Sequence, residues 1–126
     1  ARAVLMSAEV EDLELVDVDR RALDCARRNL ADTRVRFRHA DLRRPDPVMA
    51  DLDFVVMNPP FHEGSREDRG LGVAFIEAAS RRLRPGGSCW LTANRHLPYE
   101  APLGAAFRSV RLRAEAGGFK VFEAIR

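Results

Sequence analysis

The sequence predicts an α/β domain with a doubly wound, mostly parallel sheet and an antiparallel hairpin near its C-terminal end. Short apolar runs, typical of buried parallel strands, alternate with segments of helical periodicity. Two further short strands flank Gly117-Gly118, which is a hairpin signal. Hydrophobic residues make up 46% of the 126 residues and charged residues 32%, a composition that supports a packed core.

The first part of the chain reads as a strand, a helix and a strand. Residues 13–18 form a short apolar run that ends in an acid, so we expect a buried strand. Asp19 is a natural N-cap for the next helix. One face of that helix is apolar and consists of Ala22, Leu23, Ala26 and Leu30. Cys25 falls on the same side, and residues 34–39 alternate with the period of a strand.

The second part continues the alternation. Residues 53–57 predict a buried strand, which Asn58-Pro59-Pro60 stops. Residues 71–83 have helical spacing, with Gly70-Leu71-Gly72 as the helix entrance and Pro85-Gly86-Gly87 as its end. The remaining expected elements are a strand at 88–93, a weaker helix at 99–107, and hairpin strands at 109–115 and 119–125.

Bulk properties exclude several classes of protein. No apolar run reaches the length of a membrane span, and residues 1–10 lack the features of a signal peptide. The net charge of +2 is too small to establish a nucleic-acid partner. Lys120 is the only lysine, so the other basic residues are arginines, which bind phosphate better than lysine does. Genome composition is the plainer explanation of this arginine content. Cys25 and Cys89 form no CxxC pair, and the histidines show no metal-ligand spacing, so we expect two buried thiols in a reducing cytoplasm and no metal site.

The strongest chemical signal is Asn58-Pro59-Pro60-Phe61, directly after a predicted strand. Ligands of α/β sheets bind at the carboxyl ends of strands. The Asn58 side-chain oxygen and the Pro59 carbonyl can each accept an N–H of an amino group, which turns the nitrogen lone pair toward an electrophilic methyl group. Phe61 can stack on a base that has left its helix. The plainer alternative is a Pro-Pro turn that ends a strand.

Two acids are candidates for a nucleotide-type cofactor. Asp17 ends the first strand, where an acid commonly binds a ribose diol. Since either Asp17 or Asp19 can cap the following helix, we assign Asp19 to the cap and Asp17 to the ribose. Asp41 follows the second strand and can reach the adenine end of the cofactor, although a surface acid in a loop explains it equally well.

These segments resemble the ribosomal RNA small-subunit methyltransferase C family. The resemblance is carried by NPPFHEG at 58–64, RPGG at 84–87, ANRHLPYE at 93–100 and GFKV at 118–121. It implies a Rossmann-like S-adenosylmethionine-dependent methyltransferase fold. It also implies methyl transfer to the N2 amino group of a guanine in small-subunit ribosomal RNA, in the cytoplasm, with neither metal nor membrane.

The resemblance also implies roles for individual residues. The catalytic motif is then Asn58, Pro59, Pro60 and Phe61. The cofactor is bound by Asp17, Asp41 and Asn58. Phe61, Arg95 and Lys120 face the RNA, the last two as partners of phosphate. Tyr99 lies in a characteristic segment but is equally well explained as a core aromatic with a satisfied hydroxyl.

One departure from the family concerns the start of the fold. The family fold opens with a strand and a glycine-rich loop around the methionine part of the cofactor, and this chain has no glycine before Gly64. Residues 1–8 look like the tail of the helix after that loop. The strand would lie between those ending at Asp17 and Met57. We therefore expect residues 1–126 to be one catalytic domain, incomplete at its N-terminus and continuous with an upstream domain.

Two alternatives remain open at this point. An enzyme for another amino substrate, such as adenine N6 or a protein glutamine, would share the NPPF motif. A non-catalytic RNA-binding module derived from a methyltransferase is favoured by the missing glycine loop and opposed by the intact motif at 58–61.

Overall fold

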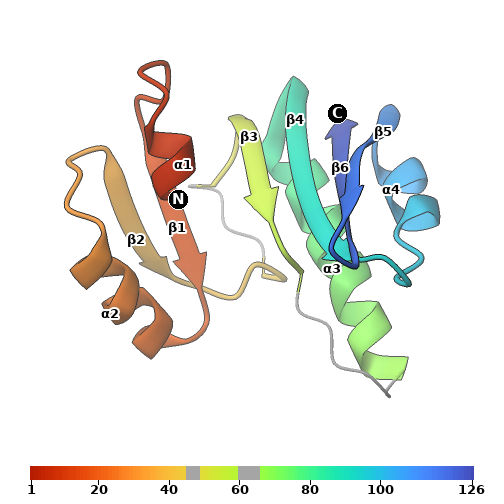
Figure 1. Cartoon of the computed structure of the whole chain (residues 1–126), viewed down its shortest axis with the longest axis horizontal. Helices are drawn as coiled ribbons and strands as arrows, with labels where there is room; N and C mark the ends of the chain where they lie inside the picture. The colour runs from red at the N-terminus through yellow and green to blue at the C-terminus, as the bar shows by residue number, and fades with distance from the viewer. Residues whose placement is uncertain (45–48, 60–65) are drawn as a thin grey trace. The chain divides into compact units, whose positions relative to one another are not determined.

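The computed structural model describes residues 1–44, 49–59 and 66–126. The chain forms two compact units, Ala1–Arg44 and Pro45–Arg126, and each is described by itself (Figure 1). Both units pair strands in parallel, as expected of an α/β protein. No helix in the described ranges is long and apolar enough to cross a membrane.

The first unit is built around two parallel strands. Its elements are α1 (Arg2–Leu5), β1 (Leu13–Asp17), α2 (Arg20–Asn29) and β2 (Val35–His39). β1 pairs with β2 from Leu13 opposite Val35 to Asp17 opposite His39. The side chain of Asp19 accepts the N–H of Arg21 at 2.9 Å, so the predicted N-cap of α2 is confirmed.

The apolar face of α2 is narrower than predicted. Leu23 is buried and Leu30 half-buried, but Ala22 and Cys25 are exposed. α2 has ten residues and packs on the sheet of β1 and β2. Only a narrow stripe of the helix surface faces these strands, and the side chains beside that stripe remain in water. The prediction that Cys25 is buried is therefore wrong.

The second unit combines parallel and antiparallel strands. Its elements are β3 (Leu52–Met57), α3 (Arg66–Arg82), β4 (Leu83–Asn94), α4 (Glu100–Ala106), β5 (Ser109–Ala116) and β6 (Phe119–Ile125). The sheet order is β3-β4-β6-β5, in which only β3 and β4 are parallel to each other. Gly117 and Gly118 have φ of +56° and +81°, the backbone that a two-residue hairpin turn requires. The predicted hairpin is confirmed.

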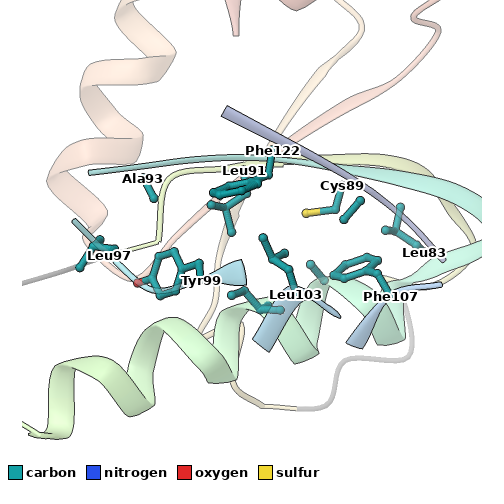
Figure 2. Close-up of a cluster of buried hydrophobic side chains, with 12 residues drawn as sticks. Leu83, Cys89, Leu91, Ala93, Leu97, Tyr99, Leu103, Phe107 and Phe122 are labelled. Atoms are coloured by element: carbon teal, nitrogen blue, oxygen red, sulfur yellow. The ribbon is translucent and has the colours of Figure 1, made fainter. Parts of the chain in front are cut away.

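The core of this unit lies between the sheet and its two helices. Cys89 and Leu91 of β4 are fully buried, as are Ile76 of α3 and Leu103 of α4. Figure 2 shows Cys89, Leu91 and Leu103 in one cluster, with Tyr99 and Phe107 at the level of the helices. The described residues of this cluster come from β4, β6, α3 and α4 and from the residues that flank α4, so one apolar layer joins the four elements.

The boundary between α3 and β4 differs from the prediction. α3 begins at Arg66, so Gly70 and Gly72 lie inside the helix rather than at its entrance. The helix ends at Arg82, and β4 starts at the next residue. Its register with β3 shifts from Leu83 opposite Leu52 to Ser88 opposite Phe54, so the intervening residues 84–87 bulge out of the sheet.

Glycine makes this bulge possible. Gly86 has φ of +80°, which side chains other than glycine rarely adopt. A Cβ at Gly87 would lie 3.0 Å from the carbonyl oxygens of Arg84 and Leu52. Residues 84–87, which resemble the family, thus form a bulge at the start of β4 and do not end the helix.

The prediction of buried strands is wrong for β1 and β3. Every residue of β1 is half-buried, and Val56 of β3 is 60% exposed. In the described ranges each of these strands has a hydrogen-bonded neighbour on one side. A strand at the edge of a sheet keeps part of its surface in contact with water even when its sequence is continuously apolar.

The different environments of the two cysteines predict different reactivity. Cys89 is buried, and desolvation raises the pKa of its thiol to about 12. Almost no thiolate is then present at pH 8, whereas Cys25 is exposed on α2. We expect a disulfide reagent to modify one thiol of this chain rapidly and the second only on unfolding, and Cys25→Ser to abolish the fast phase. Equal rates for both thiols would contradict this arrangement.

Candidate functional site

The carboxyl ends of β3 and β4 meet at one edge of the second unit. The two strands are parallel, and Met57 at the end of β3 lies opposite Leu91 of β4. Asn58 therefore leaves the sheet at the same edge as Arg95, which follows β4. The turn between β5 and β6 lies at this edge as well (Figure 1). Polar groups that follow these strands share the position at which α/β sheets bind their ligands.

The structure describes the first half of the predicted catalytic motif. Asn58 is exposed directly after β3, and Pro59 is buried. Pro60 and Phe61 lie outside the described residues. A buried proline beside an exposed amide holds the Asn58 backbone in place while the side chain stays accessible, because proline fixes its own φ and has no N–H to satisfy.

Arg95 lies at the same edge with its side chain largely in water. Its backbone N–H donates to the carbonyl of Gly118 at 2.8 Å, which ties the end of β4 to the hairpin turn. The guanidinium side chain is 69% exposed, and its Nε lies 3.7 Å from Oε1 of Glu115. An ion pair this long and this exposed is weak, so the guanidinium can exchange Glu115 for another anion.

Lys120 lies nearby but is already engaged. It pairs with Ala93 across β6 and β4, and is therefore about 10 Å from the end of β3, two strands away. Its side chain is only 17% exposed, and its Nζ donates to Oε1 of Glu100 at 2.5 Å. This hydrogen bond holds the pKa of Glu100 below its usual value. A phosphate at Lys120 would have to displace that carboxylate.

Tyr99 is a core residue, as one of the two sequence interpretations expected. It is 4% exposed and belongs to the central cluster. The expectation that its hydroxyl is satisfied is wrong, because within the described ranges the hydroxyl has no hydrogen-bond partner. Burial raises the pKa of this phenol, so it stays neutral at physiological pH.

The first unit brings its two candidate acids to one edge of its sheet. Asp17 ends β1, and Asp41 lies two residues after the end of β2, which runs parallel to β1. The backbone N–H of Ala40 donates to the Asp17 carbonyl at 3.1 Å, which links the carboxyl ends of the two strands. The geometry thus places both acids where the sequence analysis expected them.

The two acids differ in what they bind. One oxygen of Asp17, Oδ1, accepts the N–H of Asp19 at 2.8 Å. Both carboxylate oxygens of Asp41 contact the guanidinium of Arg43, with the closest distance at 2.6 Å. Hydrogen bonds from the Arg43 side chain and backbone lower the pKa of Asp41 to about 2. Asp41 is therefore ionised at physiological pH, but its charge is partly neutralised by Arg43.

The sequence analysis did not predict two contacts. Glu100 pairs with Lys120 across 20 residues, and Gly72 of α3 lies against the ring of Tyr99. No local spacing signals either contact, because both partners are brought together by the packing of α3 and α4 on the sheet. Within the described ranges, no three His, Cys, Asp or Glu side chains gather as a metal site would require.

The chain is similar in sequence to a family of methyltransferase domains. The sequence model of the methyltransferase small domain matches residues 1–123. The ribosomal RNA small subunit methyltransferase C of Hahella chejuensis is 35% identical over 114 residues, which is 90% of this chain and 33% of the relative. The protein of the same name from Alcanivorax borkumensis is 34% identical over 87% of this chain and 34% of the relative. The chain spans about a third of the length of the curated relatives it matches.

A solved structure agrees with these sequence matches. The T. thermophilus 16S rRNA N2 methyltransferase, in complex with AdoMet and guanosine, superposes with a TM-score of 0.75 at 28% identity. The match covers 91% of this chain and 31% of that one.

Proposed function

We propose, from the premise that this chain belongs to the methyltransferase small domain family, that it is the catalytic part of a ribosomal RNA methyltransferase. The enzyme would transfer a methyl group from S-adenosylmethionine to the N2 amino group of a guanine in small-subunit rRNA. The Rossmann-like methyltransferase fold predicted from the sequence is confirmed by the structural match. The observation that carries the proposal is the exposed Asn58 beside a buried proline at the carboxyl edge of the sheet.

The proposed chemistry depends on positioning. The Asn58 side-chain oxygen and the Pro59 carbonyl would accept the two N–H groups of the guanine amino group. This arrangement turns the nitrogen lone pair out of conjugation with the ring, which makes the nitrogen nucleophilic. Phe61 would stack on the base and hold it out of the RNA helix. No strong base is required, because the amino proton is lost after the methyl group has been transferred.

The residues of the first unit suit the proposed cofactor. When bound, S-adenosylmethionine supplies an electrophilic methyl group on its sulfonium. Oδ1 of Asp17 is held by an N–H, and Oδ2 has no hydrogen-bond partner among the described residues, so it can accept from a ribose hydroxyl. Asp41 would contact the adenine end, in competition with Arg43. Asn58 would be a further contact of the cofactor, as the family resemblance implies.

The substrate class follows from the amino-group acceptors and from the relatives. The two curated relatives carry the name of a small-subunit rRNA methyltransferase, and the T. thermophilus enzyme was solved with guanosine. We propose Arg95 and Lys120 as contacts to RNA phosphate, with Arg95 as the stronger candidate because its guanidinium is 69% exposed. An rRNA substrate would place the enzyme in the cytoplasm.

We also propose that residues 1–126 form part of one catalytic domain that needs a further strand. Among the described residues, β1 and β3 are both apolar strands at sheet edges, and Val56 of β3 is 60% exposed. The edge of such a strand exposes unpaired backbone groups that favour another strand. Because the chain spans about a third of its relatives, that strand and the glycine-rich loop would come from upstream sequence.

Asn58→Ala in the full-length protein tests the catalytic proposal. We expect methyl transfer to fall by about a hundredfold or more, because the amino group loses one of its two acceptors, while the affinity for S-adenosylmethionine changes little. Asn29→Ala is the matched control, since the Asn29 side chain donates to the carbonyl of Cys25 within its own helix. Digestion and mass spectrometry of the RNA should show N2-methylguanosine. Methyladenine or a methylated peptide would identify another amino substrate, and full activity of the Asn58 variant would refute the mechanism.

Replacing Asp17 and Asp19 separately tests their assignments. Asp17→Ala should weaken cofactor binding by about tenfold or more, because a hydrogen bond to a charged group is lost. Asp19→Ala should lower the Tm through loss of the N-cap and leave the dissociation constant unchanged. Isothermal titration of S-adenosylmethionine into the full-length variants measures both effects. The opposite pattern would exchange the two roles.

The proposed missing strand is tested by the same titration into two lengths of protein. The full-length protein should bind S-adenosylmethionine, and the 126-residue chain should not, because the loop around the methionine part of the cofactor is absent. Equal affinity for both would show that residues 1–126 hold a complete cofactor site. Binding by neither would favour a non-catalytic RNA-binding module.

A further inference from the structure

Phe119 is a large apolar side chain exposed to water at the candidate edge of the second unit. It begins β6 directly after the Gly117-Gly118 turn, and it is 45% exposed. Single exposed apolar residues are common on protein surfaces, so exposure alone indicates no function. The position of this residue is more informative. Because β6 runs antiparallel to β4, its start lies at the edge that also carries Asn58 and Arg95 (Figure 1).

The Phe119 side chain projects from the face of the sheet opposite α4. The next residue, Lys120, contacts Glu100 of α4, and side chains alternate between the two faces along a strand. The Cα partner of Phe119 in β4 is Asn94, and its Cα partner in β5 is Ala116. Neither partner is a large apolar residue that could cover the ring, so part of the aromatic surface is available to a ligand.

The backbone holds Arg95 beside Phe119. The Arg95 N–H donates to the carbonyl of Gly118 at 2.8 Å, one residue beyond the pair of Asn94 and Phe119. Asn94 and Phe119 are therefore a non-hydrogen-bonded pair, whose Cα atoms are about 4.5 Å apart. The guanidinium of Arg95 extends toward Glu115 near the end of β5 and is 69% exposed. An exposed ring and an exposed cation thus leave adjacent backbone positions.

The turn beside these two residues is open. A Cβ added at Gly117 or at Gly118 would meet no atom within 4 Å. Both glycines have positive φ, so they form the turn without placing a side chain beside Phe119 or Arg95. A ligand that crosses this edge can therefore reach the ring and the guanidinium together.

An exposed aromatic ring next to an exposed arginine suits single-stranded RNA. Bases of any sequence stack on aromatic rings, because every base has a flat π face. Arginine contacts phosphate, and the 3.7 Å pair of Arg95 with Glu115 is weak enough for a phosphate to replace the carboxylate. Phe119 and Arg95 thus offer one contact for a base and one for the backbone beside it.

The distance from the candidate catalytic residue is suitable for the same RNA strand. Met57, at the end of β3, lies opposite Leu91 of β4, and Phe119 lies opposite Asn94. Three residues along β4 and two strand spacings separate Met57 from Phe119, which is about 14 Å. A few nucleotides of a single strand span this distance.

We propose that Phe119 stacks on a base of the rRNA a few nucleotides from the target guanine, and that Arg95 binds a phosphate beside that base. This inference rests on the proposed function, because it gives the same substrate a second contact away from Asn58. Stacking here holds the strand while the target base is out of its helix. Phe119 therefore contributes to the affinity for RNA and leaves the binding of S-adenosylmethionine unchanged.

The test measures RNA binding to the full-length protein by fluorescence anisotropy at several salt concentrations. The probe is a labelled oligoadenylate of about 15 nucleotides with one central guanine. Phe119→Leu should weaken binding by about fivefold to a hundredfold with an unchanged salt dependence, because stacking is lost and no charge changes. Arg95→Gln should reduce the slope of log K against log salt by about 0.7, the contribution of one phosphate contact. Phe119→Tyr keeps an aromatic ring and should bind like the wild type.

Two residues of β5 provide matched controls. Leu112→Ala removes an apolar side chain that is 51% exposed, and Arg111→Gln removes an exposed cation. Both residues lie at least four positions before the end of β5 at Ala116, which is about 13 Å or more from the turn. Each control should change the affinity for the oligoadenylate by less than twofold.

A second RNA, with abasic nucleotides on both sides of the guanine, tests the stacking itself. Phe119→Leu and the wild type should bind this RNA equally, because the ring has no base to contact. The inference is overturned if Phe119→Leu still binds the abasic RNA more weakly than the wild type does. It is also overturned if Phe119→Leu binds the oligoadenylate normally, or if the wild type does not bind it.

The Tm and the methylation of RNA separate the remaining explanations. A much larger fall in Tm for Phe119→Leu than for Leu112→Ala would show that the rest of the protein covers the ring, which would overturn the inference. If guanine is methylated but RNA binding does not depend on Phe119, the proposed function stands and this inference fails. If binding depends on the ring but no guanine is methylated, the RNA surface stands and the proposed function fails.

Discussion

The arrangement of the second unit depends on the pairing of β4 along both of its edges. β4 is parallel to β3 and antiparallel to β6, so the sheet changes direction at this strand. Its inward side chains, Cys89, Leu91 and Ala93, are at most 2% exposed and form the layer on which α3 and α4 pack. Parallel pairing brings Asn58 and Arg95 to one edge, and antiparallel pairing brings the start of β6 to the same place. Without this strand, the candidate residues of the second unit would share no surface.

The packing around each polar group at this edge determines how exposed the group is and whether it has a partner. Asn58 and Arg95 follow strand ends, where the backbone leaves the sheet, and their side chains remain exposed. Lys120 lies inside β6 on the side that faces α4, so it is 17% exposed and its charge is balanced by Glu100. A cation that is removed from water needs such a partner, because a desolvated charge without a partner is strongly destabilising. Two basic residues with the same expected role thus differ in how available their charges are to another anion.

The elements of the fold were largely predictable, since strand and helix periodicities, the cap at Asp19 and the hairpin at Gly117-Gly118 are local properties. The incorrect predictions concern burial and element boundaries, which depend on the neighbouring elements. β1 and β3 are as apolar as buried strands, yet they lie at sheet edges, and Cys25 lies on the predicted face of α2 but outside the stripe that the strands cover. Residues 84–87 contain the signals that end a helix, and the sheet uses them as a bulge instead. Periodicity describes a segment and says nothing of how many neighbours the segment will have.

For the candidate site, the sequence by itself determined which residues are candidates for binding and catalysis. The Asn58 motif after a strand, the acid at Asp17 and the segments that resemble the family are all readable along the chain, because strand ends and motif spacings are local. Only the tertiary structure decided which of these groups are available. It engaged Lys120 with Glu100 and buried Tyr99 against Gly72. Partners 20 or more residues apart meet through helix and sheet packing, and no local pattern encodes the distance between them.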